Sequence, residues 1–72
     1  MTDYCASYSE IVNGKETFPP CYFYTAENDE DAKVQAEHYA KEMKQDDNEF
    51  ILLSVCEFDP ELGDDIRTVW CQ

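Results

Sequence analysis

The chain has 72 residues, of which 43% are hydrophobic and 14% aromatic, a composition typical of one folded domain rather than a disordered chain. Its 17 acidic and 5 basic residues give a formal net charge of −12, which argues against binding to nucleic acid or to anionic membranes. The sequence contains neither an apolar run of membrane-spanning length nor a signal-peptide pattern, so we expect a single cytoplasmic domain over residues 1–72.

The first third of the chain predicts a β-hairpin. Residues 1–12 alternate loosely between two faces, as a strand does. Asn13-Gly14 follows at once, and this pair is a strong hairpin signal because both positions tolerate a positive φ. We expect the returning strand to pair over residues 15–18, to be interrupted at Pro19-Pro20, which lack backbone donors, and to resume over residues 21–25.

An amphipathic helix is expected from Asn28 to about Lys44. Asn28 is a typical N-cap residue, and Asp31 stands three residues later at the capping-box position. Asp29 and Glu30 add negative charge to the first turn, where the helix dipole favours it. The apolar residues that form one stripe at helical spacing are Ala32, Ala36, Tyr39, Ala40 and Met43.

The last third predicts two more strands. Residues 50–58 are the most apolar stretch and read as a central strand, residues 59–65 as a turn and residues 66–71 as a final strand. Strict alternation places Leu52 and Cys56 on one face and Val55 on the other; it also places Thr68 and Trp70 together. The sequence therefore predicts an α+β domain of order ββαββ, with one helix on one face of a four-stranded, mainly antiparallel sheet.

The cysteines do not indicate a metal site. Cys5, Cys21, Cys56 and Cys71 include no CxxC pair, whereas structural zinc sites usually use such pairs. Their even number permits disulfides, but without an export signal we expect reduced thiols packed as small hydrophobic groups. The acidic turn over residues 59–65 lacks the spacing of an EF-hand, although weak divalent-ion binding there stays open. We expect no bound cofactor or metal.

No stretch indicates a catalytic centre. His38 is the only histidine and lies on the polar side of the expected helix, where a solvent-exposed residue is the ordinary interpretation. Gly14 and Gly63 both belong to turns, so neither forms a phosphate-binding loop. We therefore expect a protein that is not an enzyme.

The acidic residues gather in three clusters, and the expected topology places them at both ends of the domain. Solubility or adaptation to high salt explains acidity in general, and helix capping and turn preference explain some of these residues. Closely spaced carboxylates can also stand in for the phosphates of a nucleic acid and bind a basic protein surface. The residues expected to do so are Glu27, Asp29, Glu30 and Asp31 in the first cluster, Asp46, Asp47 and Glu49 in the second, and Asp59, Glu61, Asp64 and Asp65 in the third.

Apolar residues beside the acids are candidate contacts as well. Val34 lies on the polar side of the expected helix, where an apolar side chain marks a possible contact with a partner. Tyr22, Tyr24 and Trp70 are candidates too, but the simpler interpretation places these aromatic residues in the core.

In size, acidity and element order the chain resembles the small phage-encoded inhibitors of host defence, in particular the anti-CRISPR proteins. The resemblance covers the whole chain and includes no motif, so no functional residue is carried over from it. It implies a non-enzymatic inhibitor that binds a CRISPR effector complex in the host cytoplasm and blocks its DNA-binding surface.

A second interpretation is a small structural or interaction module. Such a protein would be an accessory subunit or a homodimer formed through an exposed strand edge, and its acidity would serve solubility.

Overall fold

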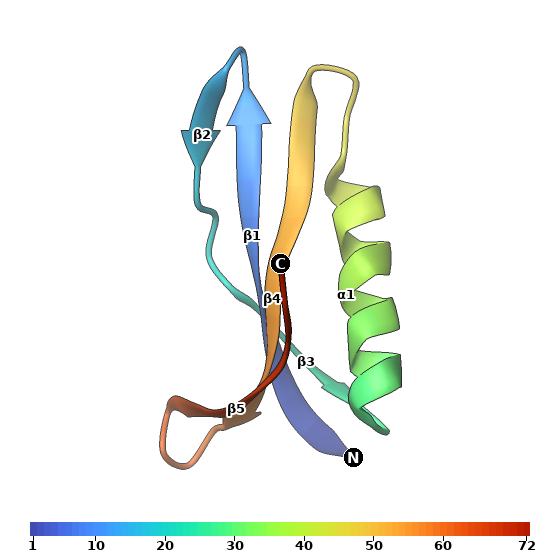
Figure 1. Ribbon diagram of the computed structural model, residues 1–72, viewed down its shortest axis with the longest axis vertical. Coiled ribbons are helices and arrows are strands. Elements are labelled where there is room, and N and C mark those ends of the chain that lie inside the picture. The colour runs from blue at the N-terminus through green and yellow to red at the C-terminus, as the bar shows by residue number, and fades with distance from the viewer.

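One helix packs on one face of a five-stranded antiparallel sheet in the computed structural model, which describes residues 1–72 (Figure 1). The sheet has the strand order β2-β1-β4-β5, and β3 also pairs with β1. The longest dimension is 37 Å and the other two are 21 and 18 Å. No helix is long and apolar enough to cross a membrane. The elements are β1 (Thr2–Val12), β2 (Lys15–Thr17), β3 (Tyr22–Ala26), α1 (Asp29–Met43), β4 (Asn48–Asp59) and β5 (Asp64–Cys71).

The predicted hairpin is confirmed, and its interruption changes the strand count. Asn13 and Gly14 have φ values of 53° and 79°, and Val12 pairs with Lys15 on the far side of the turn. After Pro19-Pro20 the chain returns to the same strand, because β3 pairs antiparallel with the first half of β1. The observed order is therefore βββαββ with five strands instead of ββαββ with four, since the prolines divide the returning strand in two.

The helix begins as its sequence predicts. The Asn28 side chain accepts a hydrogen bond of 2.9 Å from the backbone N–H of Asp31. The Asp31 carboxylate accepts one of 3.3 Å from the N–H of Glu27, so the two side chains close the first turn reciprocally. Ala32 and Ala36 are fully buried, which places the small residues of the stripe where α1 approaches the sheet.

Three tyrosines attach α1 to the sheet. Each has its ring in the layer between helix and sheet and donates its hydroxyl to a successive turn of α1, so a polar group enters the core with its hydrogen bond satisfied. The three bonds run from Tyr4 Oη to Asp29 Oδ1 (3.0 Å), from Tyr24 Oη to the carbonyl of Ala32 (2.6 Å) and from Tyr8 Oη to the carbonyl of Ala36 (2.8 Å).

A bulge decides which side chains of β4 face the helix. Ser7 of β1 pairs with Ser54, whereas Tyr8 pairs with Leu52, so β4 has one extra residue at this point. As a result Val55 is fully buried beneath α1, and Cys56 faces the other way opposite Cys5. The predicted faces of Val55 and Cys56 were wrong, because strict alternation does not anticipate the extra residue.

Two further irregularities shift β5 in the same way. Val55 pairs with Trp70 while Cys56 pairs with Thr68, which separates two residues that alternation placed together. Trp70 therefore lies on the helix side, where Lys33 Nζ stands 5.0 Å from the centre of its ring. A second shift, between Glu57 and Phe58, comes before the turn at the end of β4.

Candidate functional site

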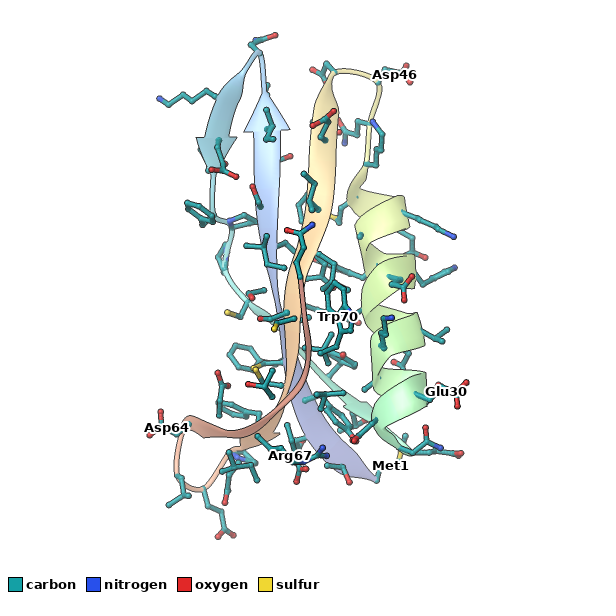
Figure 2. The ribbon with its side chains drawn as sticks, viewed as in Figure 1. Met1, Glu30, Asp46, Asp64, Arg67 and Trp70 are labelled. Carbon is teal, nitrogen blue, oxygen red and sulfur yellow. The ribbon has the colours of Figure 1, made fainter.

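The acidic clusters lie at the two ends of the long axis, as Figure 2 shows for Glu30 and Asp64 at one end and Asp46 at the other. We call the end with residues 27–31 and 59–65 the start end, because α1 begins there. The end with residues 46–49 is the stop end, where α1 has finished. The sequence indicated acidic patches at both ends, and the structure brings the first and third clusters to the same one.

Asp29 at the start end is neutralised within the protein. Arg67 Nη1 and Nη2 donate to its two carboxylate oxygens at 2.9 and 2.7 Å, and Tyr4 donates at 3.0 Å. Arg67 also donates to Glu57 Oε1 at 3.0 and 3.2 Å. The hydrogen bonds from Arg67 and then from Tyr4 lower the pKa of Asp29 below its usual value. This carboxylate therefore connects α1 to β1 and β5 instead of offering a free charge.

Three other acids of the start end also have internal roles. Asp31 accepts hydrogen bonds from Gln35 Nε2 at 2.9 Å and from the backbone at the helix start. Asp59 accepts from the backbone N–H of Glu61 at 2.9 Å, which shapes the turn between β4 and β5. Asp65 accepts from the thiol of Cys5 at 2.8 Å. Burial and then this bond raise the pKa of the Cys5 thiol to about 12.

The remaining candidate acids make no side-chain hydrogen bond or ion pair. All of them are exposed, so their charges are directed to solvent or to a partner. They occur at both ends of the molecule: Glu27, Glu30, Glu61 and Asp64 at the start end, and Asp46, Asp47 and Glu49 at the stop end.

The stop end is a short loop held by one buried side chain. Asn48 is 8% exposed, and its Nδ2 donates to Glu10 Oε2 at 2.7 Å. Lys44 Nζ donates to the Asn48 carbonyl at 2.7 Å, which closes the loop from the helix side. A shallow hollow of about 470 Å³ lies between this loop and the β1–β2 turn. Its lining includes all three acids of the cluster, Asp46, Asp47 and Glu49.

Most of the few cations are used inside the molecule. Arg67 binds Asp29 and Glu57, Lys44 closes the stop-end loop, and Lys33 lies over Trp70 and 4.0 Å from Glu37. Lys15 and Lys41 make no ion pair within the protein, and Lys15 follows the Asn13-Gly14 turn at the stop end, so the acids there have one free lysine nearby.

Val34 lies on the outer face of α1, one helical turn after Glu30. Its side chain is 59% exposed and stands between two shallow hollows of about 230 and 160 Å³. His38 lines both of them, and its Nδ1 lies 3.5 Å from Glu42 Oε1 on the exposed surface. The structure therefore places Val34 beside Glu30 of the first cluster.

The aromatic candidates belong to the core. Tyr22, Tyr24 and Trp70 all pack against the buried cluster. Tyr22 is stacked between Tyr24 and Tyr39, with ring centres 4.9 and 4.0 Å apart. The simpler interpretation of these residues is therefore confirmed.

Sequence reasoning missed Arg67 as the residue that organises the start end. Its partner Asp29 is 38 residues away, so no local pattern connects the two. One signal was present, since Arg67 is the only basic residue after Lys44. No group of three or more His, Cys, Asp or Glu side chains is placed to hold a metal ion, and the four cysteines are free thiols.

No protein-family model, curated protein or solved structure matches the chain.

Proposed function

We propose that this protein is a non-enzymatic inhibitor that binds the basic nucleic-acid-binding surface of a CRISPR effector complex and blocks DNA binding. The observation that carries the proposal is the set of acids without internal partners, which occupies both ends of a molecule 37 Å long. The identity of the partner rests on the resemblance in size, acidity and element order.

The dimensions support imitation of a nucleic acid. One turn of duplex DNA is about 34–36 Å long, close to the long axis of this protein. Duplex DNA carries roughly one charge per 1.7 Å, or about 20 charges over that length, and this chain has a net charge of −12. A channel that attracts a DNA segment would therefore also attract this protein, with less charge but on a rigid scaffold.

The internal bonds divide the acids by role. Asp29, Asp31, Asp59 and Asp65 shape the start end, since the carboxylate of each accepts a hydrogen bond from the backbone or from a neighbouring element. The unpartnered acids of both ends make the contacts with the lysines and arginines of the partner.

A competition assay with three charge-neutralised variants tests this assignment. Purified effector complexes of several types receive labelled target DNA with increasing amounts of the inhibitor across a salt series. We expect displacement that weakens as salt rises. Each double variant removes two charges and should weaken displacement about two- to thirtyfold, from ~0.2–1 kcal/mol per exposed ion pair. The variants are Glu27→Gln with Glu30→Gln, Asp46→Asn with Asp47→Asn, and Glu61→Gln with Asp64→Asn.

The matched control is Glu37→Gln with Glu42→Gln, which removes the same charge from the outer face of α1. If the control loses as much displacement as the end variants, net charge alone is responsible and the assignment to the ends is wrong. If no effector complex is displaced at any salt concentration, the proposed function is wrong.

The exposed strand edge favours a second candidate, the structural or interaction module. β5 forms one outer edge of the sheet, and its backbone is free to pair with another strand. A homodimer or accessory subunit of this kind would show self-association or a stable complex whose affinity barely changes with salt. Sedimentation velocity at low and high salt distinguishes it from the inhibitor.

A further inference from the structure

The face of the sheet opposite α1 has no covering element. Alternation along β1 turns Cys5, Ser7 and Ser9 away from Tyr4 and Tyr8, which face the helix. Ser54 and Cys56 of β4 lie on the same side, because they pair with Ser7 and Cys5. We call this surface the open face.

The polar groups of the open face are already bonded to one another. Ser7 and Ser54 share a hydrogen bond of 2.6 Å, and Ser9 donates to Glu16 at 2.6 Å. The Cys5 thiol donates to Asp65 at 2.8 Å. The centre of the open face therefore offers few free hydrogen-bond donors, and the apolar side chains beside it are those of Ile51, which pairs with Ser9, and Ile11, two residues further along β1.

An aromatic pair forms one end of this apolar surface. Phe23 pairs in register with Cys5, and its ring lies 4.9 Å from that of Phe58 on β4. Although it belongs to a strand, Phe23 is 59% exposed. Aromatic residues are enriched among those that contribute most to protein–protein binding, so this exposed ring is a candidate contact.

Acids lie toward both ends of the open face, and alternation turns Lys15, the neighbour of Glu16 in β2, to the helix side because it pairs with Val12. Glu49 and Glu16 both pair with Ile11 toward the stop end, and Asp65 lies toward the start end. Arg67 is directed to the other side, where it binds Asp29 and Glu57. Two copies placed with their open faces together would bring these acids toward one another without compensating cations, which disfavours a homodimer through this face.

We propose that the open face is the surface that docks on the partner, and that the partner's complementary surface has apolar side chains flanked by lysine or arginine. This inference rests on the proposed function and specifies the orientation of binding. The Phe23–Phe58 pair meets the apolar side chains, and the acids around the face and at both ends meet the cations. The outer face of α1 beyond its first turn, with Val34, is directed away from the partner.

Two synthetic peptides test the chemistry without an effector complex. One alternates Arg and Leu, and its matched control alternates Arg and Ser with the same charge. At ~3.3 Å per residue, about eleven residues span the long axis. We expect the Arg-Leu peptide to bind about tenfold tighter than the Arg-Ser peptide, or more. A tenfold difference corresponds to the burial of roughly 55 Å² of additional apolar surface. Fluorescence anisotropy measures affinity, and amide chemical shifts in NMR spectra locate the binding site.

Phe23→Ala and Val34→Ala form a matched pair of variants, because both side chains are 59% exposed but lie on opposite sides of the molecule. We expect Phe23→Ala to remove most of the preference for the Arg-Leu peptide and Val34→Ala to leave it unchanged. Equal affinity for the two peptides, or a loss of preference on Val34→Ala alone, overturns the inference. Chemical shifts confined to the outer face of α1 overturn it as well.

The native thiols report on the same face in an effector complex. Cys71 is exposed and pairs with Ser54, so it lies on the open face and a docked partner should slow its alkylation by iodoacetamide several-fold. Displacement of DNA with unchanged Cys71 alkylation retains the proposed function and overturns the docking face. Absence of displacement overturns the proposed function, and the peptide experiment then decides the docking face independently.

Discussion

The two faces of the sheet differ in how they bury large side chains and bond their polar groups. On the helix side, tyrosine rings fill the space up to α1, and three of their hydroxyls bond to it. On the open face, serines and cysteines bond to their neighbours within the sheet, and Phe23 remains exposed. Both faces satisfy their polar groups, but only the helix side buries large side chains within the chain itself. Stability should therefore depend mainly on the helix side, which leaves exposed positions of the open face, such as Phe23, free to change with little cost to folding.

Truncation of one aromatic residue on each face should produce the largest contrast. Tyr8 is 1% exposed and contacts Tyr39 and Phe50, so Tyr8→Ala should lower the free energy of unfolding by about 3–5 kcal/mol. Phe23→Ala loses mainly its contact with Phe58 and should cost about 1 kcal/mol. Urea unfolding followed by circular dichroism measures both. A Tyr8→Ala chain that no longer unfolds cooperatively agrees with this expectation, whereas equal costs would show that the faces contribute alike.

Removal of single hydroxyls should produce a smaller contrast within the helix side. Tyr8→Phe and Tyr24→Phe each delete a hydrogen bond to a carbonyl of α1 and should cost about 0.5–1.5 kcal/mol. Tyr22→Phe is the control, because Tyr22 is stacked in the same layer but its hydroxyl has no partner within the protein. The urea midpoints of the three variants give the comparison. A Tyr22→Phe variant as unstable as the other two would assign the loss to ring packing.

The smallest effect should appear in the pH dependence of the start end. The lowered pKa of Asp29 stabilises the folded state above the ordinary carboxyl pKa of about 3.9, and this stabilisation disappears as pH falls through the folded value. Arg67→Gln removes the main cause of the shift. The stability difference between wild type and this variant should therefore be present at pH 6 and shrink below about pH 4.

Thermal unfolding between pH 6 and pH 2.5 measures that difference. Loss of carboxylate charge on acidification relieves repulsion in both proteins alike, so only the difference between them reports on Asp29. Glu30→Gln is the control, since the Glu30 side chain has no internal partner. The stability difference between this variant and wild type should change with pH only because the charge repulsion changes. If the stability difference between wild type and Arg67→Gln stayed constant over this pH range, Asp29 would not be the group whose titration changes the stability.

Local signals explain why much of the fold could be predicted. The helix start at Asn28, the turn at Asn13-Gly14 and the break at Pro19-Pro20 each follow from the φ preferences or hydrogen bonds of a few adjacent residues. The positions of the acidic clusters at the two ends of the molecule followed from the same elements in order. Their division into bonded and free acids did not, because it depends on groups that meet only in the folded chain.

The start of α1, the turn of the hairpin and the strong acidity of the chain can be read from the amino acids alone, because they depend on neighbouring residues or on composition. The orientation of Val55 toward the helix and of Cys56 toward the open face depends on the folded chain, because a bulge alters the register between β1 and β4. Tertiary structure also decided that Arg67 neutralises Asp29 and leaves Glu30 free, since strand and helix meet at that point across 38 residues of chain.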